Sequence, residues 1–286
     1  MSALQRCVVL SLSISLFAAC GPSTLPPCSP VTLSVELVGA QVHSVRDVPR
    51  LAALDGVRVD QGPLAYYVGA NGELYEAQRE LLALYRDNGF PNAKVREPER
   101  VLSRDRKVLT LRFQVTEGQR YRLGRILIEV GQTPIVDGAQ PPRAMEPPAS
   151  VPELVPGAWY SNERLSAAMA RLKDLYREAG YAFASVGYHT DSSDKAADAL
   201  DLFLVVFAGR VVSIAGIEVE GLAATAPAEL KVGDTWQQSK IEAARAALGR
   251  AHPDYEFYYD PIEVADRPDQ AVLRFSAERK SGPPPQ

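Results

Sequence analysis

The sequence predicts an α+β protein made of tandem two-layer domains, in which small mixed sheets carry helices on one face. Two observations lead to this prediction. A segment of twelve residues occurs twice in similar form, which indicates an internal repeat. Around each copy, apolar residues recur at helical spacing before a glycine and then follow the pattern of strands. We expect each domain to have the order strand-helix-helix-strand-strand.

The repeat is clearest where residues 84–95, LYRDNGFPNAKV, align without a gap with residues 175–186, LYREAGYAFASV. The offset is 91 residues, and six of the twelve positions are identical. The same offset pairs Gly118 with Gly209 and Ile126 with Ile217. We interpret this shared spacing as a duplication.

The first copy begins with residues 31–37, whose alternation predicts a strand. A helix is predicted over 73–88, and Gly89 ends it in the left-handed conformation. Strands at 93–101 and 108–115 follow, separated by a polar loop at 103–107. The apolar face of the helix consists of Leu74, Ala77, Leu81, Leu84 and Tyr85.

The second copy repeats this order with a strand at 126–130, a helix capped by Ser161 and ended by Gly180, and strands at 184–190 and 199–207. Residues 133–157 contain seven prolines and predict an inserted surface loop. The apolar helix face consists of Leu165, Ala168, Leu172, Leu175 and Tyr176. We expect Tyr85 and Tyr176 to be core residues that turn their hydroxyls toward polar partners.

A third copy is predicted from a strand at 214–221, a helix at 238–249 with Ile241, Ala244 and Leu248 inward, and strands at 255–264 and 271–277. The chain therefore divides into predicted domains at 31–118, 119–209 and 210–279. A disordered tail is predicted at 280–286.

The corner Tyr-x-x-x-Gly-aromatic-x-x-Ala-x-Val, the strand ending Phe113-Gln114-Val115-Thr116-Glu117-Gly118 and the Ile-x-Ile/Val strand after it resemble the POTRA domain, the polypeptide-transport-associated repeat. The resemblance covers residues 31–279. It implies periplasmic domains that receive unfolded outer-membrane or secreted polypeptides and bind partners partly by adding a strand to a sheet edge.

In this family the second strand of each unit is the usual edge. The resemblance therefore implies partner-binding edges at 93–100, 184–190 and 255–264. The candidate residues are Ala93, Val95, Ala184, Val186, Tyr188, Tyr255, Phe257 and Tyr259.

The aromatic run at 255–259 has two interpretations. Alternation places Tyr255, Phe257 and Tyr259 on one face and Tyr258 on the other. We favour three core aromatics on the first face. The alternative is an exposed aromatic edge that binds a partner.

The first 19 residues predict a secretory signal, with Arg6 before a short apolar run that ends in small residues. Leu16-Phe17-Ala18-Ala19-Cys20 resembles the bacterial lipobox, which implies cleavage before Cys20 and acylation of that cysteine. Gly21 favours the outer membrane by the same resemblance, and residues 20–30 form a proline-rich tether. The alternative is an ordinary cleaved signal, in which case a Cys20–Cys28 disulfide becomes possible.

Composition argues against several other classes. The formal net charge of −4 gives no basic stripe for nucleic acid. His43, His189 and His252 are far apart and lack metal-ligand spacing, so no metal or cofactor is expected. No phosphate-binding loop or nucleophile elbow is present, and we expect no enzymatic activity. Only nine residues follow Ala277, so we expect any barrel partner to be a separate chain.

Three functions agree with these observations. The leading one is a lipid-anchored periplasmic scaffold that assists outer-membrane protein assembly or polypeptide translocation. The runner-up is an envelope-organising or cell-surface binding lipoprotein that uses the POTRA fold for another protein ligand. A third is the periplasmic half of a split transporter.

The anchor can be tested directly. A Cys20→Ala variant is expected to lose membrane association, because acyl chains contribute about 0.8 kcal/mol per buried CH₂ and the variant has none. Fractionation of cell envelopes measures this, and a variant that stays in the membrane fraction would contradict the prediction.

Overall fold

The computed structural model describes residues 32–41, 54, 59–61, 66–68, 72–105, 107–131, 145–192, 198–224 and 227–280. The signal, Cys20, the tether and the predicted tail beyond Lys280 lie outside the described residues. The chain divides into two compact units. The first is Met1–Leu123, Gly157–Arg164 and Asp194–Leu200, and the second is Gly124–Pro156, Leu165–Ser193 and Asp201–Gln286. The domain limits proposed from the sequence stay a prediction.

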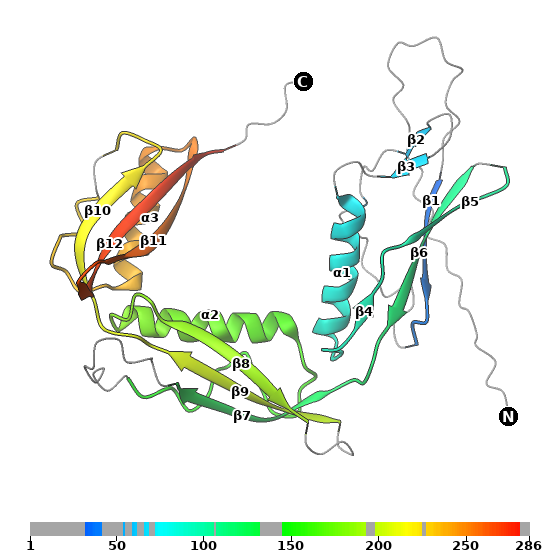
Figure 1. Cartoon of the computed structure of the whole chain (residues 1–286), viewed down its shortest axis with the longest axis horizontal. Helices are drawn as coiled ribbons and strands as arrows, with labels where there is room; N and C mark the ends of the chain where they lie inside the picture. Colours follow the sequence, from blue (N-terminus) through cyan, green and yellow to red (C-terminus); the bar gives the residue numbers. More distant parts are fainter. Residues whose placement is uncertain are drawn as a thin grey trace, which may run out of the picture. The chain divides into compact units, whose positions relative to one another are not determined.

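The first unit contains a mixed sheet in the order β1-β6-β4, with β5 also paired to β6 (Figure 1). Strand β1 runs parallel to β6, whereas β4 and β5 run antiparallel to it. The short strands β2 and β3 form a separate antiparallel pair. The bounds are β1 Thr32–Val38, β2 Val59–Gln61, β3 Tyr66–Val68, α1 Glu73–Asp87, β4 Lys94–Val95, β5 Glu99–Leu102 and β6 Val108–Thr116.

Two further sheets have the orders β7-β9-β8 and β10-β12-β11, and each again has the strand that follows its helix at one end. The starts of β7, α2 and β9 belong to the first unit, and the remainder belongs to the second. The bounds are β7 Arg122–Val130, α2 Asn162–Glu178, β8 Ser185–Asp191, β9 Ala199–Phe207, β10 Ser213–Glu220, α3 Gln238–Ala251, β11 Tyr255–Val264 and β12 Arg267–Arg279. The predicted α+β class, with small mixed sheets and helices, is confirmed.

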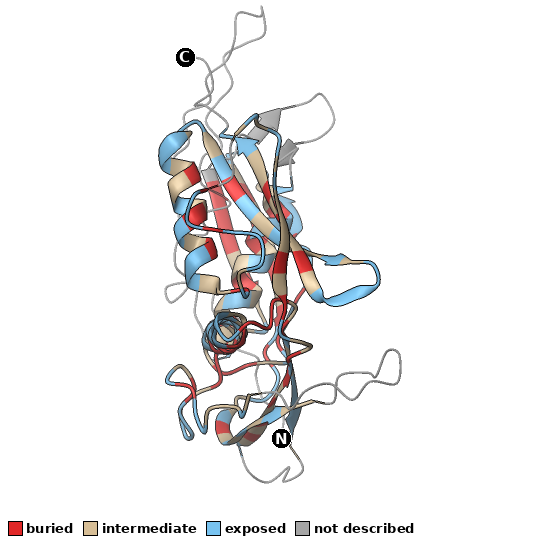
Figure 2. Ribbon diagram, turned by 90° about the vertical axis from the view of Figure 1, so that its left-hand side faces the viewer, coloured by how far each residue is buried: buried red, intermediate tan, exposed pale blue. Residues whose placement is uncertain are grey.

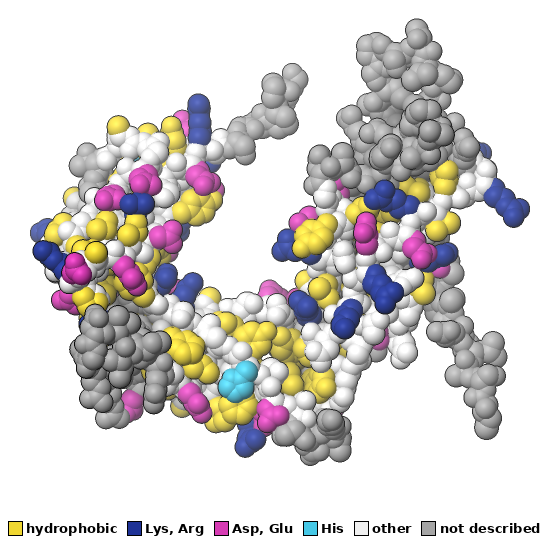
Figure 3. Space-filling view, viewed as in Figure 1, with side chains coloured by type: hydrophobic (Ala, Val, Ile, Leu, Met, Phe, Trp, Pro, Cys, Tyr) yellow, Lys and Arg dark blue, Asp and Glu magenta, His cyan; other side chains and the backbone are white. Residues whose placement is uncertain are grey.

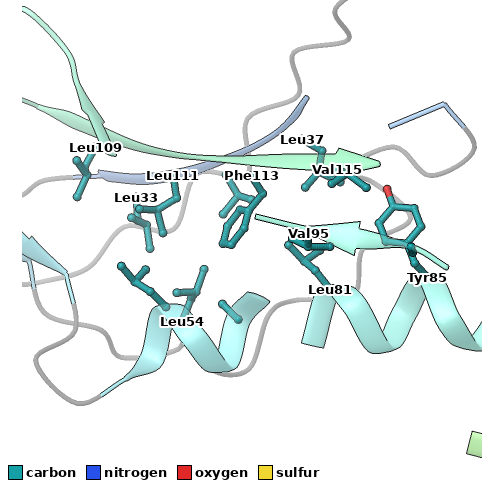
Figure 4. Close-up of a cluster of buried hydrophobic side chains, with 14 of the residues drawn as sticks. Leu33, Leu37, Leu54, Leu81, Tyr85, Val95, Leu109, Leu111, Phe113 and Val115 are labelled. Atoms are coloured by element: carbon teal, nitrogen blue, oxygen red, sulfur yellow. The ribbon is translucent and has the colours of Figure 1, made fainter. Parts of the chain in front are cut away.

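The core of the first unit lies between α1 and one face of its sheet (Figure 4). Strand β6 alternates buried and half-buried residues along its length, as a strand with one covered face should. Leu111 and Phe113 of β6 and Leu81 and Tyr85 of α1 are fully buried. Burying each such side chain stabilises the folded state by about 1.5–3 kcal/mol relative to leaving it exposed to water. Strand β9 has the same alternation, and the helices show buried residues on one side and exposed residues on the other (Figure 2).

The duplicated corner ends α1 and α2 by one mechanism. Gly89 and Gly180 have φ of 100° and 102°, which confirms the predicted left-handed caps. The N–H of Phe90 donates to the carbonyl of Tyr85 at 3.1 Å, and that of Tyr181 donates to Tyr176 at 3.1 Å. This bond defines a Schellman ending, and the aromatic rings of each pair lie about 6 Å apart, as the motif's apolar contact requires.

Both corner tyrosines are core residues, as predicted, with no exposed surface. The Tyr176 hydroxyl donates to the Met145 carbonyl at 2.9 Å. Tyr85 faces Glu117, and burial together with the Glu117 carboxylate raises the pKa of the Tyr85 hydroxyl. Ser161 accepts the N–H of Arg164 at 3.2 Å, which confirms it as the N-cap of α2.

The structure corrects four details. The strand expected at 93–101 is divided into β4 and β5 around Pro98, since proline supplies no backbone donor. Val151 and Leu154 are buried, so the described part of the predicted surface loop 133–157 adds to the core. The described residues 145–160 and 227–237 form turns where the first helix of the predicted order was expected. Leu175 is 43% exposed, at the margin of its helix face.

Gly180→Val is expected to lower the free energy of unfolding by about 2–3 kcal/mol, because valine resists a positive φ. Its Cβ would also lie 2.8 Å from Val211 Cγ1. Urea unfolding measures the effect. Gly249→Ala is the control, since Gly249 lies within α3 with nothing within 4 Å of its Cβ position. It should leave stability unchanged or raise it, and equal unfolding of all three chains would contradict the prediction.

Candidate functional site

The candidate site is the set of sheet edges formed by the strands after each helix. Among the described strands, β4 pairs with β6 alone, β8 with β9 alone and β11 with β12 alone. An edge strand presents alternate backbone N–H and C=O groups that have no partner within the sheet. The edge position agrees with the sequence interpretation, and partner binding there stays a prediction.

The opposite edges are partly occupied. In the second repeat, the Leu123 N–H donates to Ala158 at 2.8 Å and the Gly157 N–H donates back to the Leu123 carbonyl at 2.7 Å. In the third repeat, Ile214 exchanges the same two bonds with Asp234 and Gly233, each at 2.8 Å. A short segment before each helix therefore pairs with the start of β7 and of β10.

The first edge is short. Ala93 and Val95 are 3% and 7% exposed, so their side chains lie in the core. The Val95 carbonyl accepts a bond from the Gln78 side chain at 2.6 Å, which uses an outward backbone acceptor. Only Lys94 and Val95 pair in β4.

The second edge is longer. Ala184, just before β8, is buried at 2% exposure, whereas Val186 is half-buried and Tyr188 is 47% exposed. All seven residues of β8 pair with β9 in unbroken antiparallel register, from Ser185 opposite Phe207 to Asp191 opposite Asp201.

The third edge, β11, has the predicted alternation. Phe257 is buried, and Tyr255 and Tyr259 pack against the same core, whereas Tyr258 on the other face is 47% exposed. The core interpretation of these three aromatics therefore holds. The Tyr259 hydroxyl donates to Glu242 at 2.8 Å and accepts from Gln238, and burial followed by the Glu242 bond raises the pKa of Tyr259 to about 12.

Sequence reasoning missed a contact that is made twice. Asp87 at the end of α1 accepts the N–H of Glu163 at 2.7 Å and the hydroxyl of Ser161 at 3.3 Å, at the start of α2. Glu178 at the end of α2 accepts the N–H and the hydroxyl of Ser239, both at 2.7 Å, at the start of α3. The last turn of one helix thus caps the next helix.

A second connection accompanies each cap. The Gly89 carbonyl accepts the Tyr121 N–H at 2.8 Å, and the Gly180 carbonyl accepts the Val212 N–H at 3.0 Å. In the chain that follows Gly89, the guanidinium carbons of Arg120 and Arg122 lie over the Trp159 ring, 3.8 and 4.0 Å from its centroid. The pairing of Asp87 with Glu178 at the 91-residue offset was the signal that could have indicated these contacts.

Other site types have little support in the described residues. They contain no group of three histidine, cysteine or acidic side chains placed to hold a metal ion. A hollow of about 380 Å³ lies beside α2 and is mainly apolar. Its lining is Pro148, Ser150, Val151, Pro152, Arg171, Leu172 and Leu175.

Comparison with known proteins agrees with the sheets and helices described above. Residues 149–208 match the POTRA family model, described as the surface antigen variable number repeat. This chain is a POTRA-domain protein. The matched residues contain α2, β8 and β9, with the described turns before them.

Two relatives extend the similarity beyond this segment. The outer membrane protein assembly factor BamA of Neisseria meningitidis serogroup B is 22% identical over 260 residues, covering 87% of this chain. The present chain spans 31% of the length of that relative. The crystal structure of Haemophilus influenzae BamA POTRA3-5 has a TM-score of 0.65 and 16% identity, covering 86% of this chain and 94% of that one. The structural likeness confirms the fold.

Glu178→Ala is expected to lower the free energy of unfolding by about 1 kcal/mol, the usual contribution of a helix cap. The bonds from Ser239 lower the pKa of the Glu178 carboxyl. The stability that the Glu178 carboxylate contributes is therefore fully present above the ordinary glutamate pKa. It is lost as the pH falls through the lowered pKa of Glu178 in the folded protein. Urea unfolding at pH 7 and pH 3 should show a difference that shrinks in acid. Asp174→Ala, an exposed change on the same helix, is the control, and a pH-independent difference would contradict the prediction.

Proposed function

We propose that this POTRA protein is a periplasmic scaffold, anchored by lipid on Cys20, that assists outer-membrane protein assembly or polypeptide translocation. It acts by binding extended polypeptide segments, and it has no enzymatic activity of its own. Its partners are an outer-membrane β-barrel protein, unfolded outer-membrane or secreted polypeptides, or both.

The observation that carries the proposal is the repeated open edge on POTRA sheets. Strands β8 and β11 pair on one side only, and β8 has a largely exposed surface. An extended polypeptide gains main-chain hydrogen bonds at such an edge whatever its sequence, and alternate side chains then add selectivity. A protein that handles many polypeptides needs this kind of contact.

The similarity to BamA supports the cellular setting. That relative is described as an outer membrane protein assembly factor, and the alignment covers most of this chain. None of the helices among the described residues is long and apolar enough to cross a bilayer. The proposed acyl group on Cys20 provides attachment.

Affinity purification from detergent-solubilised envelopes tests this function. We expect the tagged full chain to co-purify an outer-membrane β-barrel protein or unfolded outer-membrane polypeptides, identified by mass spectrometry. The Cys20→Ala chain is the control, because its loss from the membrane should reduce capture of an assembled barrel. Recovery of cell-wall or surface proteins alone would reject the proposal.

A further inference from the structure

The three open edges differ in their capacity to accept another strand. The first is interrupted at Pro98 and pairs through only two residues in β4. The third contains Pro261 within β11 and has a register shift between Glu263 and Val264. Proline and charge on an edge are common means of preventing strand addition. Strand β8 has the sequence SVGYHTD, without proline and with one carboxylate at its end, so it is the edge best suited to a partner strand.

The sheet that contains β8 also has an unusual outer face. The β9 side chains that point away from the buried set include Asp201, which pairs with Arg125 of β7 at 2.6 Å, and beyond it Phe203, Val205 and Phe207. Phe207 is 41% exposed. Phe203 stacks on His189 of β8, with ring centroids 4.6 Å apart. Leu127 of β7 is 39% exposed. Hydrophobic side chains gather over β8 and β9 on the face seen in Figure 3.

The corresponding faces of the other sheets are charged. In the first sheet, Arg112 of β6 pairs with Glu36 at 2.9 Å and Glu99 at 3.7 Å. In the third, Arg274 of β12 pairs with Glu218 at 3.1 Å and Glu220 at 3.2 Å. The β7-β9-β8 sheet also has an ion pair, between Arg125 and Asp201, but the outward side chains that follow it on β9, Phe203, Val205 and Phe207, are all apolar.

Gly187 leaves an open position where this apolar face meets the edge. It lies on β8 opposite Val205, and its φ is outside the left-handed region that would require glycine. The nearest atom to a Cβ built there is Cε2 of Phe207, at 3.8 Å, which is an ordinary contact. Neither the backbone conformation nor the available space requires a glycine at position 187. The absence of a side chain there leaves one side of the Phe207 ring uncovered.

We infer that β8 binds an extended segment with an aromatic side chain opposite Gly187, and that this ring packs over Gly187 against Phe207 and Val205. The inference rests on the proposed strand-addition function and names its edge and ligand class. A strand added to β8 lies about 4.8 Å from it. Because Gly187 has no Cβ, a large side chain on that strand can extend across Gly187 to the side chains of β9. Aromatic residues are known to cover a cross-strand glycine in this way.

The ligand class follows from the period of the strand. Side chains of the added segment alternate between the outer face and the helix side, so its apolar residues should occur at every second position. Strands of outer-membrane barrels have this alternation and are rich in aromatic residues near their ends. The neutral stretch Ser185–Thr190 favours an uncharged segment over a basic or acidic one.

Two labelled ten-residue peptides test the inference by fluorescence anisotropy with the full chain in detergent. One alternates threonine with tyrosine and tryptophan, and the matched peptide has alanine at the aromatic positions. We expect the aromatic peptide to bind about five- to tenfold more tightly, the gain of one aromatic pair. That preference should disappear in Gly187→Val, which fills the open position, and in Phe207→Thr, which removes the ring.

Gly216→Val is the matched control. Gly216 lies on β10 of the third sheet, opposite Val272, with similar room at its Cβ position. It should keep the aromatic preference. Thermal unfolding establishes that each variant is folded, and the two test variants change different residues so that one failure of folding does not end the test.

The outcomes separate the inference from the function on which it rests. If neither peptide binds the native chain, the strand-addition function is wrong. If both bind equally well, or if the preference survives Gly187→Val and Phe207→Thr, the function stands and the position at Gly187 is wrong. If Gly216→Val removes the preference, the aromatic side chain is recognised on the third sheet.

Discussion

The left-handed glycine at the end of α1 and of α2 is the constraint on which the first two repeats depend. At Gly89 and Gly180 the chain reverses with φ near +100°, which directs it from the helix into the next strand. The reversal brings an aromatic residue back onto the tyrosine of the last turn and buries both rings. In these two repeats a residue that tolerates this conformation lets the helix and the sheet edge lie together, whereas α3 ends at His252 with φ of −131°.

The same corner joins successive repeats. The glycine carbonyl accepts an N–H from the chain that enters the following strand, and the acid two residues before it caps the following helix. A six-residue motif thus ends a helix, closes a core and binds the next repeat. All three contacts use neighbouring residues, and these residues lie within the segment that the two copies share at 84–95 and 175–186.

Much of this architecture could be predicted because its causes are local. The helix faces, the glycine caps and the alternation of β9 and β11 follow from spacing alone. The burial of Val151 and Leu154 could not be predicted, since it depends on how a proline-rich segment folds back beside α2. The capping of the next helix by Asp87 and Glu178 could not be predicted either, because an acidic residue near a helix end is usually exposed to solvent. No local sequence pattern distinguishes Gly187, because its proposed role depends on the Phe207 ring of the neighbouring strand.

The three edges show how one fold can limit binding to a chosen place. An open edge exposes backbone groups that any extended chain can use, including another copy of the protein, so unprotected edges promote aggregation. Pro98 interrupts the first edge and Pro261 lies within the third, and neither feature occurs in β8. If all three edges served the same purpose, similar strands would be expected at each. The proline-free edge instead coincides with the apolar outer face, and this coincidence is the physical reason to place recognition on the second repeat.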